Sequence, residues 1–252
     1  MTKKNEFCAL ILAAGKGTRM KSDMAKVLHL MEGRPLLYYP LRAARSAGAE
    51  KIIVIAGHQY DMVTAAFPDP DLTFVEQNPQ LGTGHAVMQA KDALVDYRGL
   101  TVILCGDVPL LKPETIRKLI SAHEKARAGV TVLTTEPPGP HAYGRIVKDG
   151  RGDVIKIVEH RDASEDERKI TEINSGIYCV DTRFLFSALA RIKNDNQQQE
   201  YYLTDIVEIA RRDGVRVHAF LIDDYIEVMG INTPDELARA ESHLRRKTSF
   251  QG

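Results

Sequence analysis

The first part of the chain alternates between short apolar runs and stretches that have the spacing of amphipathic helices. The runs of strand length are Phe7–Leu12, Lys51–Ala56, Leu72–Glu76 and Thr101–Cys105, and the helical stretches between them are Pro35–Gly48, Gln59–Phe67 and Gly84–Val95. Near-continuous apolar strands joined through helices favour a parallel sheet that is covered on both faces and connected by right-handed crossovers. The pattern therefore predicts a doubly wound α/β sheet, which binds ligands beyond the carboxyl ends of its strands.

The pattern changes after Pro113, which predicts the first turn of a helix. Strand-like runs then follow with little helix between them, at Val130–Thr135, Arg145–Lys148, Val154–Glu159 and Ile173–Val180. They predict antiparallel strands inserted beside the parallel sheet. Helical spacing returns over Tyr201–Asp213 and Pro234–Lys247, and Thr233 with Glu236 predicts a capping box at the start of the second of these helices. No repeat or linker divides the chain, so we expect one α/β domain.

Composition narrows the classes of partner. The 252 residues include 34 Lys plus Arg and 34 Asp plus Glu, so no net charge favours nucleic acid or an anionic membrane surface. Cys8, Cys105 and Cys179 lie far apart in apolar runs, which indicates neither a disulfide framework nor a metal site of paired cysteines. We expect a cytoplasmic protein that has neither a nucleic acid nor a membrane as partner.

The amino terminus resembles a short signal peptide, because Lys3 and Lys4 precede the apolar run Phe7–Ala14. That run has only the length of a strand, and no segment approaches the ~18 apolar residues of a membrane span. It passes directly into a loop of glycines and cationic residues. We therefore interpret the run as the first strand of the sheet.

The loop Leu12–Met20 follows that strand and carries the first candidate chemistry. Its glycines let backbone N–H groups approach a phosphate without a Cβ in the way, and Lys16 and Arg19 supply charge-assisted hydrogen bonds. The dinucleotide-binding pattern needs a small residue where Met20 stands, and the Walker A pattern needs a Gly-Lys-Ser/Thr ending that is absent. The loop is interpreted as a triphosphate site of another kind.

Two later segments carry groups that suit a nucleotide. Lys26 is near enough in the chain to return to phosphates held by the loop, although without that loop it would be interpreted as a solvated surface lysine. The Gln77 amide matches the donor and acceptor edge of uracil, and Gly82 with Thr83 offers N–H and hydroxyl groups at a helix start. His85 is interpreted as an ordinary first-turn residue.

Asp107 comes directly after the fourth predicted strand, between a glycine and Val108-Pro109. A carboxylate at that edge of a parallel sheet suits a hard cation that bridges phosphates, and the alternative is an ordinary aspartate turn. Small or amide residues recur at later strand edges, in Ala142–Ile146, Ile157–His160, Glu172–Gly176 and Gly230–Thr233. Each of these alone is only a turn signal.

In this order, the segments from Leu12 to about Glu236 resemble the uridylyltransferase domain of the bifunctional bacterial UDP-N-acetylglucosamine pyrophosphorylases. Sugar-nucleotide pyrophosphorylases in general share the first loop and the Gly-Asp turn, whereas Gln-Leu-Gly-Thr-Gly-His-Ala and Glu-Tyr-Tyr-Leu-Thr-Asp point to this subfamily. The resemblance implies a Rossmann-like nucleotide-diphospho-sugar transferase fold. It implies a nucleotide-binding part over about residues 5–112 and a sugar-binding and C-terminal part over about 113–252.

The resemblance also implies roles for matched residues. Uridine would contact Leu12, Ala13, Gly15, Gln77, Gly82 and Thr83, and Gly106, Gly144, Glu159 and Asn174 would surround the sugar and ribose. Ala14, Lys26, Cys105, Asp107 and Asn232 complete the implied substrate-binding set. Mg²⁺ would be held by Asp107 and Asn232, and Arg19 with Lys26 would neutralise the triphosphate. Arg19, Lys26, Asp107 and Asn232 form the implied catalytic set.

Four departures from the family are visible. Ala25 replaces a common proline, Cys105 stands where some members have an aromatic residue, and Ser175 replaces a common threonine. The bifunctional enzymes also continue into a β-helix that carries an acetyltransferase, whereas this sequence ends at Gly252. It is either a stand-alone pyrophosphorylase or a shortened form, from which we expect no acetyl transfer and a monomer or weak dimer.

The resemblance implies that the protein joins UTP to N-acetylglucosamine 1-phosphate and releases pyrophosphate, a reaction that serves peptidoglycan synthesis in the cell wall. Two alternatives stay open at this point. One is the same chemistry on another sugar 1-phosphate or nucleotide, and the other is a nucleotide-sugar binding module without catalysis. A nicotinamide-dependent dehydrogenase is excluded by Met20, as argued for the loop.

Overall fold

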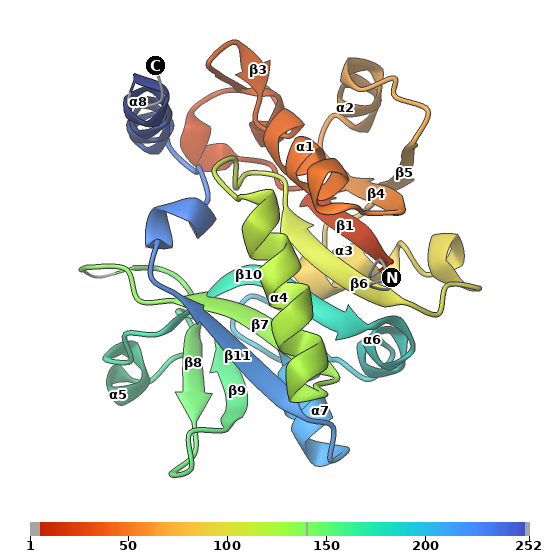
Figure 1. Ribbon diagram of the computed structural model, residues 1–252, viewed down its shortest axis with the longest axis vertical. Helices are drawn as coiled ribbons and strands as arrows, with labels where there is room; N and C mark the ends of the chain where they lie inside the picture. The colour runs from red at the N-terminus through yellow and green to blue at the C-terminus, as the bar shows by residue number, and fades with distance from the viewer. Residues whose placement is uncertain (1–5, 140, 250–252) are drawn as a thin grey trace.

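A twisted sheet runs through the molecule in the strand order β11-β7-β10-β6-β1-β4-β5, with the hairpin β8–β9 attached to β10 (Figure 1). The computed structural model describes residues 6–139 and 141–249, so Lys3 and Lys4 lie outside the described residues. The strands are β1 (Phe7–Ala13), β4 (Lys51–Ala56), β5 (Leu72–Glu76), β6 (Leu100–Cys105), β7 (Val130–Thr135), β8 (Arg145–Lys148), β9 (Val154–Val158), β10 (Ile173–Asp181) and β11 (Val217–Ile222). A separate hairpin joins β2 (Leu30–Met31) to β3 (Arg34–Pro35).

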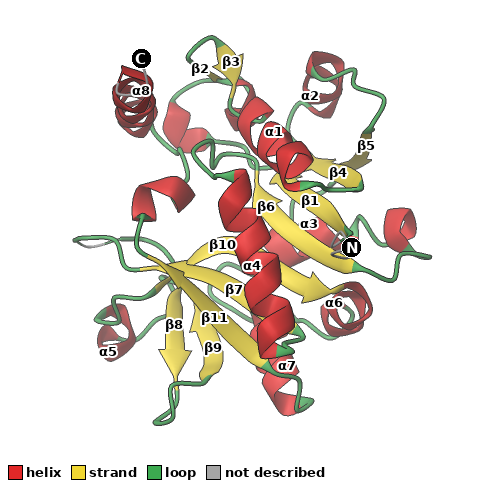
Figure 2. Cartoon of the chain, viewed as in Figure 1, coloured by secondary structure: helices red, strands yellow, loops and turns green. Residues whose placement is uncertain are grey.

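Helices cover both faces of the sheet, as Figure 2 shows, with α1 and α4 crossing the face toward the viewer. They are α1 (Tyr38–Ala47), α2 (Tyr60–Ala66), α3 (Thr83–Met88), α4 (Pro113–Ala126), α5 (Glu165–Arg168), α6 (Thr182–Leu189), α7 (Asp205–Arg212) and α8 (Pro234–Ser249). Short 3₁₀ turns add η1 (Thr18–Met20), η2 (Lys26–Leu28), η3 (Asp92–Leu94) and η4 (Tyr225–Val228). The predicted α/β class with a mostly parallel sheet is confirmed.

The two faces have separate hydrophobic cores, because side chains alternate along each strand. Phe7, Ala9 and Ile11 of β1 pack toward α1 and α4, where Leu41 and Leu119 belong to the same cluster. On the opposite face, Cys8 and Leu10 share a cluster with residues from three helices: Ala86 from α3, Leu185 from α6 and Ile206 from α7. Burial on both faces explains why the central strands have apolar sequences without alternation.

The parallel half of the sheet agrees with the pattern, since β1 pairs in parallel with both β4 and β6, and β4 pairs in parallel with β5. The antiparallel strands predicted for the second half are confirmed, but they belong to the same sheet instead of lying beside it. β10 lies inside the sheet, antiparallel to both β6 and β7, and an unpredicted strand, β11, pairs in parallel with β7. One continuous sheet therefore joins the two halves of the chain.

Three helices begin or end at residues other than those predicted, because main-chain groups near their ends form hydrogen bonds outside the helix or over a shorter spacing. The start of α1 is delayed because the Leu36 and Leu37 N–H groups donate to carbonyls of the preceding loop. The predicted helix after Gly84 tightens at Ala90, whose N–H bonds three residues back to Val87, and it stops before η3. Tyr201 is held in extended contact with the loop before α3, so α7 begins four residues later.

The C-terminal helix α8 begins as the pattern predicts. The N–H of Glu236 donates to the Thr233 hydroxyl at 3.2 Å, and the Glu236 carboxylate accepts from the Thr233 N–H at 3.0 Å, which confirms the capping box. Pro113 likewise occupies the first turn of α4. The helix α6, capped by Asp181 through the Phe184 N–H, was not predicted. Within residues 6–139 and 141–249, no helix has the length and apolar character needed to cross a bilayer.

Candidate active site

The loop after β1 is shaped by a glycine that the fold requires. Gly17 has φ +64°, and a Cβ added there would lie 2.7 Å from the Lys26 Cβ. Only glycine therefore allows this close approach, which brings η2 and its lysine beside the loop. At Gly15, by contrast, a Cβ would meet no atom within 4 Å among the described residues. The space beside the Gly15 backbone is open, as a phosphate-binding turn requires.

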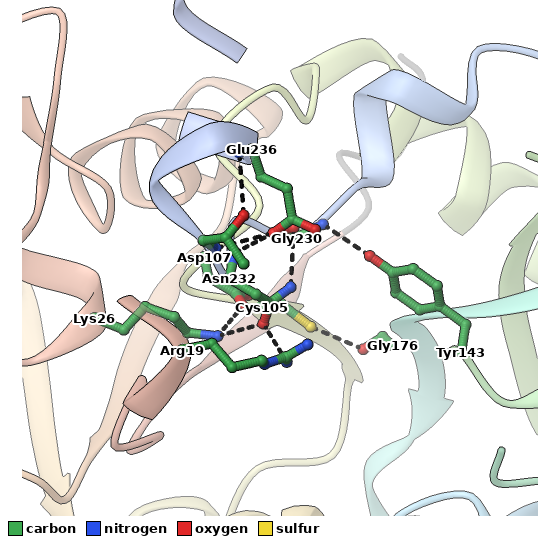
Figure 3. A network of polar contacts seen from close by, with 10 residues as sticks. Arg19, Lys26, Cys105, Asp107, Tyr143, Gly176, Gly230, Asn232 and Glu236 are labelled. Carbon is green, nitrogen blue, oxygen red and sulfur yellow. Dashed lines mark hydrogen bonds and ion pairs between the residues drawn. The ribbon is translucent and has the colours of Figure 1, made fainter. Parts of the chain in front are cut away.

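Four polar side chains from distant parts of the chain meet at this loop (Figure 3). The Lys26 Nζ donates to a carboxylate oxygen of Asp107 and to the Asn232 Oδ1, the latter at 3.2 Å. The Arg19 guanidinium donates to the same Asn232 oxygen at 2.8 Å. Lys26 and Asp107 are mostly buried, with 15% and 18% of their side chains exposed. All members of the predicted catalytic set are thereby brought together.

The backbone fixes the geometry of that cluster. The Ile231 N–H donates to the Asp107 carbonyl at 2.8 Å, which ties the turn after β6 to the segment before α8. The Asn232 N–H donates to the Glu236 carboxylate at 2.6 Å, so the capping box also holds Asn232. A Cβ at Gly230 would lie 3.2 Å from the Asp107 carboxylate. The glycine thus leaves room for the aspartate to face Asn232.

Two adjoining cavities meet at the cluster. The first, the loop cavity, has a volume of about 500 Å³ and lies over the loop after β1. It is lined by Leu12, Ala13, Ala14, Gly15, Lys16, Lys26, Val27, Gln77, Gln80, Gly82, Thr83, Ala86, Cys105, Asp107 and Glu200. The second, the strand cavity, has a volume of about 460 Å³ and includes Leu12, Arg19, Thr83, Cys105, Asp107, Gly144, Glu159, Asn174 and Asn232 in its lining. Asp107 lines both cavities and marks their junction.

Gly106 differs from the other predicted binding residues, since it lines neither cavity. Its N–H donates to the Leu12 carbonyl at 2.9 Å, and a Cβ there would lie 3.0 Å from the same oxygen. Gly106 therefore lets the end of β6 pack closely against β1. That contact positions the next residue, Asp107, at the carboxyl edge of the sheet.

Gln77 lines the loop cavity, but its amide nitrogen already contacts other parts of the protein. The side chain is 4% exposed, and its Nε2 donates to the Gly82 carbonyl at 2.9 Å and lies 3.2 Å from the His85 Nδ1. The nitrogen is thus occupied within the protein. In this arrangement the oxygen is the part of the amide that is left for a ligand.

Two motifs that are far apart in the chain form one wall of the site. The Tyr201 N–H donates to the Leu81 carbonyl at 2.8 Å, and the Gly84 N–H donates to the Tyr201 carbonyl at 2.7 Å. Gly82 has φ +104°, and a Cβ there would lie 2.7 Å from the Tyr201 oxygen. The Thr83 hydroxyl accepts from the Leu203 N–H at 3.1 Å. These contacts hold the segment before α7 against the start of α3.

The strand cavity is lined by polar side chains, several of which are buried. The Asn174 Oδ1 accepts from the Gly176 N–H at 2.9 Å, where the pairing of β10 is irregular. Glu159 accepts from the Thr204 hydroxyl at 3.3 Å, and burial raises the pKa of its carboxyl. The Gly144 carbonyl accepts from the Asn174 N–H at 2.9 Å, which places both residues in one wall.

Several lining residues were missed in the sequence. Tyr143 lies in the strand cavity, where its hydroxyl accepts from the Gly230 N–H at 3.2 Å, and burial raises its pKa to about 12. Thr204 and Glu236 also line that cavity, and Gln80 lines the loop cavity, with its amide donating to the Ala14 carbonyl at 2.7 Å. Tyr143 and Thr204 occur in motif segments, so the segments were informative although the individual residues were not.

The structure shows what each of the three residues that differ from the family contacts. The Ala25 N–H donates to the Gln59 side chain at 2.7 Å, a bond that proline cannot make. The Ser175 hydroxyl donates to the Leu133 carbonyl at 2.6 Å and keeps the strand turn in place. Cys105 lines both cavities, and burial raises the pKa of its thiol to about 12, so it is a neutral wall residue.

The cluster has the chemistry to bind a hard divalent cation. The Asp107 carboxylate and the Asn232 amide oxygen both contact one cationic group, the Lys26 ammonium, so they already converge on positive charge. Mg²⁺ typically takes one or two protein oxygens and completes its shell with water and substrate phosphates. Among the described residues, no group of three or more His, Cys, Asp or Glu is placed to hold a metal ion.

Comparison with known proteins defines the class of this chain. Residues 9–200 match the model of the MobA-like NTP transferase domain, and the chain belongs to that family of nucleotidyltransferases. It is 50% identical over 244 residues to the bifunctional protein GlmU of Geobacter sulfurreducens, an alignment that covers 96% of this chain and 51% of the relative. GlmU of Pelotomaculum thermopropionicum is 49% identical over 242 residues, and GlmU of Syntrophotalea carbinolica is 46% identical over 245.

These alignments cover 96% and 97% of this chain, respectively, and 53% of each relative. The chain therefore spans about half of the length of the relatives that it matches. The resemblance to bifunctional bacterial enzymes, predicted from the motifs, is confirmed.

Proposed function

We propose that this chain transfers the uridylyl group of UTP to N-acetylglucosamine 1-phosphate and releases pyrophosphate. One observation carries the proposal: Arg19 and Lys26 meet Asp107 and Asn232 where the loop cavity joins the strand cavity. A junction between two binding spaces, lined with cations and oxygen ligands, suits a reaction between two phosphates. The similarity to GlmU proteins supports this chemistry.

In the proposed reaction an oxygen of the sugar phosphate attacks the α-phosphorus of UTP. A new phosphorus–oxygen bond forms, the bond to the bridging oxygen of the β-phosphate breaks, and pyrophosphate leaves with that electron pair. The sugar phosphate is largely ionised at neutral pH, so no protein nucleophile or general base is required. The protein is proposed to act by holding the two phosphates in line and neutralising their charge.

The loop cavity is proposed to hold the nucleotide. The open backbone beside Gly15 provides N–H groups for the triphosphate, and the Gln77 oxygen faces the base. Arg19 and Lys26 would neutralise the phosphates and the departing pyrophosphate, because cations near the reacting oxygens stabilise charge that develops in the transition state. Mg²⁺ bound by Asp107 and Asn232 would supply further charge neutralisation between the two reacting phosphates.

The strand cavity is proposed to hold the sugar. Asn174 offers a donor and Glu159 an acceptor, which is the mixture that hydroxyl and acetamido groups require. A site that hydrogen-bonds an acetamido group leaves buried polar atoms unpaired when that group is missing. We therefore expect glucose 1-phosphate to be a much poorer substrate than N-acetylglucosamine 1-phosphate.

Residues from about 5 to 112 are proposed to form the nucleotide-binding part of one domain. Residues from about 113 to 252 are proposed to form its sugar-binding and C-terminal part. Asn232 is the exception, since it belongs to the second part and contacts Lys26 in the first. A cytoplasmic location is proposed, in keeping with the free thiols of Cys8, Cys105 and Cys179. The monomer or weak dimer stays a prediction, which light scattering at micromolar concentration would test.

Two alternatives are separated by one experiment. Pyrophosphate release is measured with UTP, CTP, ATP and GTP, each against a panel of sugar 1-phosphates in the presence of Mg²⁺. The proposal predicts release with UTP and N-acetylglucosamine 1-phosphate, with kcat/KM well above that for glucose 1-phosphate. Equal values for the two sugars would reject the substrate assignment. Binding of UTP without release from any sugar phosphate would identify a non-catalytic module.

A further inference from the structure

The Gln77 amide has one orientation because of its neighbour Gly82. A backbone carbonyl can only accept hydrogen bonds, and the Gly82 oxygen lies 2.9 Å from the terminal nitrogen of Gln77. Turning the amide by half a turn would place two oxygens against each other at that distance in a side chain that is 4% exposed. The nitrogen must therefore face Gly82, and the oxygen is on the other side of the amide.

The second hydrogen of that nitrogen is directed at the His85 ring, whose Nδ1 is 3.2 Å away. Because the Gln77 nitrogen is a donor, Nδ1 must be the acceptor, and the neutral ring then carries its proton on Nε2. Burial lowers the pKa of His85, which favours this neutral form. The terminal nitrogen of Gln89 lies 3.2 Å from Nε2 and donates to the His85 carbonyl at 3.0 Å. Gln89 is only half-buried, so its amide can turn to accept from the Nε2 proton, whereas the buried Gln77 amide cannot turn. The Tyr201 ring centroid lies 6.2 Å from that of His85.

With both hydrogens of its nitrogen engaged, Gln77 has only its oxygen left for a ligand. No described residue donates a hydrogen bond to this oxygen, and Gln77 lines the loop cavity. An oxygen that only accepts matches a base with an N–H in the middle of its pairing edge. Uracil has such a group at N3, whereas the N3 atom of cytosine is itself an acceptor. An acceptor facing an acceptor leaves both groups unpaired.

We propose that His85 is a positioning residue that sets pyrimidine selectivity through Gln77. It occupies the second hydrogen of the amide, so that the site presents an acceptor to the base and selects uridine over cytidine nucleotides. The inference rests on the proposed function, in that the loop cavity holds the nucleotide. It also gives His85, interpreted from the sequence as an ordinary first-turn residue, a part in recognition.

The test measures dissociation constants of UTP and CTP by calorimetry, which requires no turnover. In His85→Leu the acceptor is lost, one hydrogen of Gln77 is released, and the amide is held by Gly82 alone. We expect UTP to bind about 3- to 10-fold more weakly and the UTP/CTP preference to fall by a similar factor. His85→Asn, whose side-chain oxygen can replace Nδ1, should recover most of the preference. His85→Ala serves the same purpose if leucine is not accommodated.

The matched control is His218→Leu, which removes another half-buried histidine, on β11 and outside the lining of both cavities. It should leave both dissociation constants unchanged. An unchanged UTP/CTP ratio in folded His85→Leu or His85→Ala would overturn the inference, as would an equal change in the control. Failure of the proposed function would instead appear as absent pyrophosphate release in the wild-type protein, while the binding ratios remain measurable.

Discussion

The two cavities that meet at Asp107 are built in different ways. The loop cavity lies at the carboxyl ends of parallel strands, and its lining includes backbone beside Gly15 and the cations Lys16 and Lys26. The strand cavity lies against the antiparallel strand β10, and its lining includes the buried side chains of Glu159 and Asn174. Backbone N–H groups and cationic side chains suit phosphates, which are negatively charged, whereas buried side chains that donate and accept hydrogen bonds suit a sugar.

One sheet presents two kinds of site because its strands do not all run in the same direction. Parallel strands end at a common edge, where N–H groups and a carboxylate collect. The reversed direction of β10 brings the irregular turn at Asn174–Gly176 to the same edge. Gly176 has φ +80°, and a Cβ added there would lie 3.0 Å from the Cys105 sulfur. The reversal therefore places polar side chains from the start of β10 at the edge where a further parallel strand would end.

The junction between the two cavities should be the most sensitive point. Asp107→Asn keeps the shape of the side chain and an oxygen for Lys26 but removes the charge proposed to hold Mg²⁺. We expect kcat to fall about 100- to 1000-fold at saturating UTP, sugar phosphate and Mg²⁺. The free energy of unfolding should change by less than about 1 kcal/mol, because asparagine keeps an oxygen that accepts from Lys26.

Asp224→Asn is the matched control for that variant, since Asp224 also pairs with a lysine, Lys112, at 3.1 Å. Its turnover should equal that of the wild type. Near-normal kcat in Asp107→Asn would mean that the aspartate is only a turn residue and that the metal assignment is wrong.

The strand cavity should respond to the loss of a neutral donor. Asn174→Asp keeps the oxygen that accepts from the Gly176 N–H and replaces the amide nitrogen by a second oxygen. We expect KM for the sugar phosphate to rise about 10-fold or more, because a charged group near Glu159 replaces a donor. KM for UTP should stay within about 2-fold of the wild type. A rise in KM for UTP alone would contradict the proposed division of the cavities.

The loop cavity should show the opposite pattern. Gln77→Ala removes the oxygen proposed to face uracil, a contact made equally in the ground state and the transition state. We expect KM for UTP to rise about 3- to 10-fold with kcat retained, and discrimination against other nucleotides to relax. Steady-state kinetics with both substrates varied checks the result. A change confined to KM for the sugar phosphate would contradict the assignment of the loop cavity to the nucleotide.

The smallest effect concerns stability behind the strand cavity. Burial, reinforced by Glu208 and other carboxylates, raises the pKa of Asp205 to about 6. The folded state therefore binds this proton more tightly than the unfolded state, and stability is lost as the pH rises toward and through 6. Asp205→Asn should recover about 1 kcal/mol at pH 7.5, a value reduced for partial exposure, and nothing at pH 3.5. Denaturant unfolding at both pH values tests this, and an equal gain at both would contradict it.

The sequence predicted local features better than contacts between distant segments. The bounds of β4 were predicted correctly, because a buried parallel strand has a continuous apolar run. The edge strand β11 was missed, since much of it is only half-buried and its pattern is weak. The predicted binding residues mostly line the cavities, but the pairing of Lys26 with Asp107 spans 81 positions, and periodicity carries no information about it.

The Gln77 amide shows the same limit at a finer scale. Its residue type indicated base recognition, yet the orientation that decides donor or acceptor depends on Gly82 and His85, which follow in a different element. Which atom donates and which accepts in such a network depends on neighbours in space, and these are known only from the folded structure.

The central claim is that the sugar phosphate itself attacks the α-phosphorus of UTP at the junction of the two cavities. It is tested by mass spectrometry of the products formed from UTP and N-acetylglucosamine 1-phosphate that carries ¹⁸O in its phosphate. The account predicts that UDP-N-acetylglucosamine retains all of the label and that pyrophosphate contains none. Label in pyrophosphate, or formation of UMP in place of the labelled sugar nucleotide, would contradict it.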